Sequence, residues 1–138
     1  MAEFTGRVLV GGSGQGPAIV LDEPLSFWGG FDAESGRVIE ARHAQAGASL
    51  AGKVLVMPGG RGSSSSSSVL AQALRRGTGP AAILLARADE IIALGALIPN
   101  LLDGSRFPVI ELGQADYASI KTGDAVTVRE DGTITCSN

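Results

Sequence analysis

The stretch from Lys53 to Arg76 constrains the fold of this chain more than any other part, and its sequence is KVLVMPGGRGSSSSSSVLAQALRR. Val54 to Met57 form a short apolar run of the kind that makes a buried strand, and Pro58 to Gly60 end it. Apolar residues then recur at helical spacing from Val69 to Leu74. The pattern predicts a strand, a loop and a helix in succession, with the serines at the N-terminus of the helix.

The position of this loop favours anion binding. The first backbone N–H groups of a helix lack intrahelical partners, and the helix dipole is positive there. Glycines and hydroxyl side chains at such a place suit a carboxylate or phosphate, and Arg61 adds a guanidinium that suits either anion. No Lys-Ser or Lys-Thr pair follows the last glycine, so the sequence does not match a Walker loop.

The serine tract from Ser63 to Ser68 also allows a plainer interpretation. Six consecutive serines are typical of a flexible linker. A linker has no reason to join a buried strand directly to an amphipathic helix, so the context favours an ordered loop. Some of these serines can cap the helix, but one cap requires only one serine.

Composition bounds the class of protein. The 138 residues predict a single domain, 1–138, and 44% hydrophobic with 18% charged residues predicts an ordered one. A net charge of −3 without a basic cluster argues against nucleic acid as a partner. The N-terminus lacks the features of a signal peptide, and the apolar region from Ala81 to Leu102 is broken by charges and Pro99. We therefore expect a cytoplasmic protein without a membrane partner.

The sequence gives little support for a metal site, a hydrolase triad or a dinucleotide-binding site within this chain. The single cysteine, Cys136, cannot form an internal disulfide or hold a metal alone, so we predict no metal site in this chain. His43 would be the only base available to a Ser-His-Asp hydrolase, and the Gly-x-Ser-x-Gly motif of such enzymes is absent. The glycines from Gly11 to Gly16 fail the dinucleotide fingerprint, because Pro17 and a strand follow, and indicate a tight turn.

The rest of the chain supplies strands at both ends of a parallel strand–helix–strand unit, whose second strand is Ala81 to Leu85. This predicts an α/β fold with layered sheets, a β/β/α domain, and not a doubly wound sheet. The other expected elements are strands at Thr5–Val10, Ala18–Leu21, Arg37–Glu40 and Pro108–Leu112, a helix at Asp89–Leu97, and a hairpin of Ala125–Arg129 with Thr133–Thr135.

The segment from Pro24 to Asp32 holds three of the six aromatic residues of the chain beside two glycines. Such rings must pack against something. They can plug the core, or the segment can line a site or a partner surface, and the sequence leaves both interpretations open.

At these residues the chain resembles a known family, the small subunit of aconitase X enzymes, which is the swivelling domain of the aconitase superfamily. The resemblance covers nearly the whole chain. It depends on an early Gly-x-Gly turn and on PLSFWGGFDAESGRVIEARHAQAG (24–47), LAGKVLVMPGGRGSSSSS (50–67), GPAAILLARADEIIALGA (79–96) and KTGDAVTV (121–128).

The resemblance implies a swivelling β/β/α fold and a larger partner subunit that carries an iron–sulfur cluster and most of the site for a small carboxylate substrate. It also implies that Ser63 is the base that removes a proton next to the substrate carboxylate, while the iron of the cluster takes the leaving hydroxyl. Backbone donors at the helix N-terminus, with Arg61 nearby, would stabilise the serine alkoxide.

The predicted site therefore has Ser63 as its catalytic residue, and the register within Ser63–Ser65 stays open. Other aconitases carry an arginine two residues after this serine, where this chain has Ser65, so substrate anchoring must differ. The predicted substrate-binding residues are Arg61, Gly62, Ser64 and Ser65 of the loop and Ser26, Phe27, Trp28 and Gly29 of the aromatic segment.

Two substrates are open within the family. One is cis-3-hydroxy-L-proline, which is dehydrated to a pyrroline carboxylate, and the alternative is mevalonate 5-phosphate. The absence of a Lys and Arg excess, which is common in proteins from hot habitats, favours the first. A third hypothesis, from another class, is a mobile swivel module without chemistry of its own.

Overall fold

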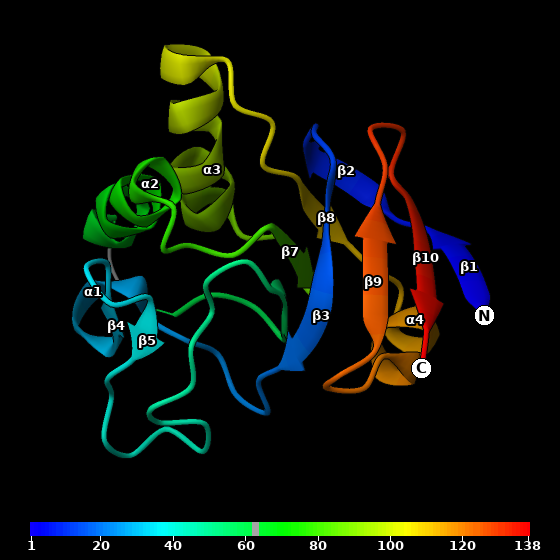
Figure 1. Cartoon of the computed structure of the whole chain (residues 1–138), viewed down its shortest axis with the longest axis horizontal. Coiled ribbons are helices and arrows are strands. Elements are labelled where there is room, and N and C mark those ends of the chain that lie inside the picture. Colours follow the sequence, from blue (N-terminus) through cyan, green and yellow to red (C-terminus); the bar gives the residue numbers. More distant parts are fainter. Residues whose placement is uncertain (62–63) are drawn as a thin grey trace.

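The structure is a computed structural model that describes residues 1–61 and 64–138. In this part of the chain eight strands form one mixed sheet in the order β1-β10-β9-β3-β6-β7-β8-β2 (Figure 1). The bounds of these strands are β1 (Ala2–Thr5), β2 (Arg7–Val10), β3 (Gly14–Val20), β6 (Val54–Met57), β7 (Ala82–Leu85), β8 (Val109–Glu111), β9 (Ala125–Val128) and β10 (Thr133–Ser137).

The centre of the sheet is parallel. Strands β3, β6, β7 and β8 run in the same direction, and the outer strands β9, β10, β1 and β2 each pair antiparallel with their neighbours in the sheet. Helix α2 (Ser65–Arg76) connects β6 to β7, and helix α3 (Glu90–Asp103) connects β7 to β8. The two helices lie side by side over one face of the sheet (Figure 1). The predicted strand–helix–strand unit and the predicted α/β class are confirmed.

Burial explains this architecture. Val54 and Val56 belong to a core inside the curved sheet, whereas Leu55 and Met57 belong to a second core beneath the helices. All four side chains of β6 are buried, because a parallel strand in the middle of such a sheet is covered on both faces. The continuous apolar run that predicted this strand is a consequence of that double cover.

Gly6 lies at the point where the curved sheet nearly closes. Strands β1 and β2 are separated only by this residue, yet they lie at opposite ends of the strand order. A Cβ atom on Gly6 would lie 2.3 Å from Ile110 Cγ2 and 2.8 Å from the Glu111 carbonyl oxygen. Only glycine fits there. The single strand expected at Thr5–Val10 is therefore wrong, because the chain changes partner at Gly6.

Three other expectations need correction. Strand β3 begins at Gly14, because Gly14 to Pro17 pair with β9 and do not form a turn. Helix α3 continues to Asp103 through the buried Pro99, since its packing against α2 offsets the loss of one backbone hydrogen bond. A short helix, α4 (Gln114–Ser119), precedes the final hairpin, and the strand at Arg37–Glu40 is reduced to β5. The remaining elements are α1 (Phe27–Gly30), β4 (Phe31–Asp32) and β5 (Arg37–Val38).

None of the helices that the structure describes is both long enough and apolar enough to cross a membrane.

Candidate active site

The loop that follows β6 lies at the edge where the parallel strands end. The segments that follow β3, β6, β7 and β8 all start at this edge, because the four strands run in the same direction. Ligands of open α/β sheets bind outside the carboxyl ends of the strands. The predicted anion-binding loop therefore lies where this fold is expected to bind a ligand.

The loop is held between two other segments before it enters α2. The backbone of Gly60 forms a parallel bridge with Leu25, and the Arg61 N–H donates to the Leu25 carbonyl at 3.3 Å. On the other side, a Cβ on Gly60 would lie 2.6 Å from Asp89 Oδ2. Asp89 caps α3, because its Oδ1 accepts the N–H groups of Ile91 and Ile92 at 2.9 and 3.0 Å. The loop thus lies next to the N-termini of two helices.

The serines of the tract have different environments. Ser66 and Ser67 are buried, and their hydroxyls are used inside the protein. Ser66 Oγ accepts the Trp28 N–H at 3.2 Å, and Ser67 Oγ donates to the Ser64 carbonyl at 2.7 Å. Ser64 and Ser65 are exposed, and the Ser64 side chain forms no capping bond. Ser66 and Ser67 are therefore structural, while Ser64 and Ser65 are accessible at the start of α2.

Gly62 and Ser63 lie outside the residues that the structure describes. Their predicted roles, in substrate binding and as the base, remain predictions.

Arg61 has an acidic partner. Its Nη2 lies 2.5 Å from both carboxylate oxygens of Glu40, which follows β5. Half of the Arg61 side chain is exposed, so the pair lies at the surface beside the loop. The charge that was predicted to bind substrate is thus balanced by Glu40, and substrate would have to compete with this carboxylate.

Sequence reasoning missed Arg87, which follows β7. Its backbone N–H donates to the Pro58 carbonyl at 3.0 Å, and its guanidinium lies over the buried Gly59. The signal that could have found it is positional, because an arginine two residues after a parallel strand reaches the same edge as the loop after the neighbouring strand.

In the aromatic segment from Pro24 to Asp32, one ring packs in the core and another lies at the surface. Phe27 is fully buried and meets Phe31 edge to face, with ring centroids 5.1 Å apart, so it belongs to the core. Trp28 is 60% exposed, and its backbone is fixed by the hydroxyl of Ser66 and by that of Ser26, which donates to the Trp28 carbonyl at 2.8 Å. Gly29 has a left-handed φ of 84°. Ser26, Trp28 and Gly29 lie beside the first turn of α2, whereas the Phe27 ring points into the core.

His43 is a structural residue. It is buried, its Nδ1 accepts the Gln45 N–H at 3.0 Å, and its Nε2 lies 3.3 Å from the Glu23 carbonyl oxygen. Because Nδ1 accepts, Nε2 must carry the proton that is donated to Glu23. Both ring nitrogens are occupied, so His43 is not placed to act as the base of a hydrolase.

Cys136 is also engaged. Its thiol donates to Asp124 Oδ2 at 3.3 Å inside the curved sheet. Burial, together with the hydrogen bond to Asp124 and the charge of that carboxylate, raises the pKa of Cys136 to about 11. In the part of the chain that the structure describes, no three His, Cys, Asp or Glu side chains come together as metal ligands. These residues do not fit an iron–sulfur cluster.

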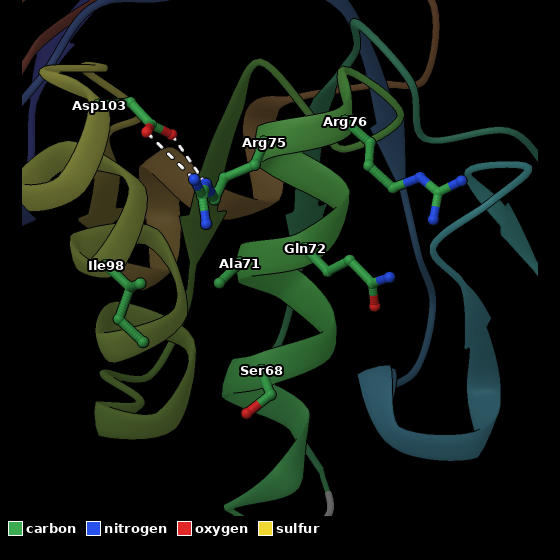
Figure 2. Close-up of a pocket in the computed structure, with 7 residues that line it drawn as sticks. All are labelled: Ser68, Ala71, Gln72, Arg75, Arg76, Ile98 and Asp103. Atoms are coloured by element: carbon green, nitrogen blue, oxygen red, sulfur yellow. Dashed lines mark hydrogen bonds and ion pairs between the residues drawn. The ribbon is translucent and has the colours of Figure 1, made fainter.

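A hollow much larger than the one at the loop lies elsewhere, between α2 and α3. Figure 2 shows it between the outer faces of α2 and α3, where Arg75 reaches across to Asp103. Its volume is about 610 Å³, and Arg75 Nε lies 2.9 Å from Asp103 Oδ2. Among the serines of the tract that the structure describes, 64–68, Ser68 alone lines it. At the loop itself the hollow is small, and its lining is Gly60, Arg61, Ser66, Asp89, Ile91 and Ile92.

Comparison with known proteins agrees with the fold. The family model of the aconitase X swivel domain matches residues 3–136. The chain therefore belongs to the aconitase X swivel domain family.

Individual relatives differ in how much of their length is matched. A cis-3-hydroxy-L-proline dehydratase of Pseudomonas aeruginosa is 46% identical over 108 residues, which make up 78% of this chain and 19% of that enzyme. The phosphomevalonate dehydratase small subunit of Methanocella arvoryzae is 41% identical over 132 residues, which make up 95% of this chain and 94% of that subunit. The crystal structure of Thermococcus kodakaraensis aconitase X in its holo-form matches with a TM-score of 0.88 and 34% identity over 100% of both chains.

Proposed function

We propose that this chain is the small subunit of an aconitase X hydro-lyase and that the complex dehydrates cis-3-hydroxy-L-proline. The observation that carries the proposal is the match of residues 3–136 to the aconitase X swivel domain. Identity does not choose between the substrates of the relatives, because it is 46% with the Pseudomonas hydroxyproline dehydratase and 47% with the phosphomevalonate dehydratase small subunit of Methanothermobacter thermautotrophicus; the choice rests on the absence of a Lys and Arg excess in this chain.

In this reaction the chain supplies the base. A serine removes the proton from the carbon next to the carboxylate, the electrons of that C–H bond form a double bond, and the hydroxyl on the neighbouring carbon leaves, so that water is lost overall. We assign the base to Ser63, with Ser64 and Ser65 as neighbours in the anion pocket. The burial of Ser66 and Ser67 supports this assignment, because it removes two of the six serines from consideration.

A serine hydroxyl needs help to act as a base. The alkoxide that forms would lie at the N-terminus of α2, where backbone N–H groups without helical partners stabilise negative charge. No acidic residue lies in the first turn of α2 to oppose that charge. Trp28 and Ser26 would border the substrate from the other side of the loop.

The iron–sulfur cluster belongs in this proposal to a large partner subunit. Relatives named as small subunits imply such a partner. The described residues of this chain offer no ligand set for a cluster, so we assign no step of the reaction here to iron. The substrate would bind between the two subunits.

The second candidate substrate is mevalonate 5-phosphate. Relatives named phosphomevalonate dehydratase small subunits match over most of their own length, 94% in the one from Methanocella arvoryzae. Both candidate substrates carry a carboxylate, so the loop suits either. The phosphate of the second would require further positive charge from the partner.

The test is reconstitution with an aconitase X large subunit from the same organism, sought first in the reading frame next to the gene of this chain, followed by assays with both substrates. We expect turnover of cis-3-hydroxy-L-proline by the complex and none by the isolated chain. The Ser63→Ala complex should lose at least about 100-fold in kcat, the lower end of a general base contribution. Ser68→Ala is the matched control, because Ser68 lines the hollow between α2 and α3 and should leave kcat unchanged.

The outcomes separate the hypotheses. Turnover of mevalonate 5-phosphate alone would replace the substrate, and normal turnover by the Ser63→Ala complex would remove Ser63 from the mechanism. If the complex forms but is inactive with both substrates, the alternative of a swivel module without chemistry stands.

A further inference from the structure

We propose that Arg87 binds the carboxylate of the substrate and that Gly59 is the residue that gives its guanidinium room to do so. The inference rests on the proposed function. It assigns the anchoring role to the loop after β7, one strand away from the serine loop in which Arg61 lies.

The first support is the position of Arg87. It follows β7, which lies between β6 and β8 in the sheet, and its N–H is bonded to the Pro58 carbonyl of the serine loop. The two loops are thus joined through backbone at the carboxyl edge. An anion that meets the start of α2 lies at the same edge of the sheet as this arginine.

The second support is the contact with Gly59. A Cβ built on Gly59 would lie 3.0 Å from Arg87 Nη2, 3.4 Å from Cζ and 3.5 Å from Nε. The guanidinium therefore lies across the glycine, in space that a larger residue would occupy. The backbone of Gly59 does not require a glycine, because its φ is not in the left-handed region. The absent side chain is what makes room for Arg87.

The third support is charge. Arg61 is balanced by Glu40, and Arg7, which faces β8, is paired with Glu111 at 3.4 Å. Among the residues that the structure describes, the guanidinium of Arg87 takes part in no ion pair or hydrogen bond. A guanidinium keeps its charge at every working pH, and its fork of donors matches a carboxylate. Arg87 is therefore available to a substrate anion without first leaving an acidic partner.

The nearest acidic side chain in sequence, Asp89, is occupied differently. Its Oδ1 caps α3 and its Oδ2 faces Gly60. The guanidinium of Arg87 and the serine loop thus lie at one edge of the sheet, and the carboxylate of the capping residue Asp89 faces the backbone of the loop.

The experiment uses the reconstituted complex and four variants of this chain: Arg87→Ala, Arg87→Lys, Gly59→Ala and the double variant Gly59→Ala with Arg87→Ala. Steady-state kinetics with cis-3-hydroxy-L-proline give kcat and KM. Competition by the carboxamide of the same compound, which lacks the negative charge, gives a second affinity. If the wild-type complex turns over only mevalonate 5-phosphate, that compound and its carboxamide are the probes.

We expect Arg87→Ala to raise KM for the carboxylate about 10- to 100-fold, as removal of a hydrogen-bonded charge does, with little change in affinity for the carboxamide. Arg87→Lys should recover part of the loss. Gly59→Ala should weaken carboxylate binding in the wild-type background and have no further effect when Arg87 is already alanine, because the two residues act through one contact.

Two matched controls lie outside the proposed contact. Gly113→Ala adds a methyl group where no heavy atom lies within 4 Å, and Arg106→Ala removes an exposed arginine that precedes β8 and so lies at the opposite edge. Both should leave KM unchanged.

The results that overturn the inference are distinct from those that overturn the function. An active wild-type complex whose KM is unchanged by Arg87→Ala, or equal losses for carboxylate and carboxamide, would remove Arg87 from substrate binding while the function stands. A further loss from Gly59→Ala in the Arg87→Ala background would refute the contact. A wild-type complex without turnover of either substrate would overturn the proposed function, and the inference with it.

Discussion

Replacement of Ser66 by alanine tests the internal use of the serine tract. The Ser66 hydroxyl accepts the Trp28 N–H at 3.2 Å from a site that is only 3% exposed. Its loss leaves that N–H without a protein partner, which costs about 1–2 kcal/mol. Alanine has the better helix propensity and returns about 0.5 kcal/mol. The net loss in free energy of unfolding is about 1 kcal/mol, which for a domain of this size lowers Tm by about 3–4 °C.

The assay is thermal unfolding followed by circular dichroism, with Ser68→Ala as the control. Ser68 is in the same helix but exposed, so its replacement gains the helix propensity without losing a bond, and Tm should rise by about 1–2 °C. Equal shifts for the two variants would refute the assignment of Ser66 as a structural residue, because helix propensity alone would then account for both.

Four further predictions concern other parts of the structure. The Cys136 thiol, with its pKa raised to about 11, should resist iodoacetamide at pH 8 until the chain is unfolded; fast alkylation of the native chain would contradict its burial. Because the folded pKa lies above the unfolded value, the unfolded chain loses this proton first, so the free energy of unfolding should fall between about pH 9 and pH 11 in urea titrations, and Cys136→Ala should lack that fall. Arg75→Ala should lower the free energy of unfolding by less than about 1 kcal/mol in the same titrations, because its pair with Asp103 is half exposed, and a larger loss would give the hollow of Figure 2 a structural role. The fluorescence of Trp28, the single tryptophan, should shift to shorter wavelength when the large subunit binds, and an unchanged spectrum would place Trp28 outside the interface.

Local patterns were sufficient for the centre of the fold. The apolar run of β6, the glycines after it and the helical spacing from Val69 onward predicted the strand–loop–helix unit, since strand and helix periods are visible within a dozen residues. The hairpin of β9 and β10 was equally local, because Gly132, with a φ of 88°, supplies the turn. The same reasoning ended the helix too early, at Leu97, because a proline such as Pro99 is tolerated inside a helix when packing compensates for the lost hydrogen bond.

Some features of the candidate site also follow from the local sequence, and others depend on the tertiary structure. The sequence alone determined that a serine and glycine loop stands at a helix N-terminus, because that follows from adjacent residues. Only the tertiary structure decided which serines turn inward, that Phe27 packs in the core while Trp28 faces solvent, that Glu40 balances Arg61, and that Arg87 lies over Gly59. The contacts of Ser66 with Trp28, Arg61 with Glu40 and Arg87 with Gly59 join segments that are more than 20 residues apart in the chain, and such contacts arise from how the strands are ordered in the sheet, which no local period encodes.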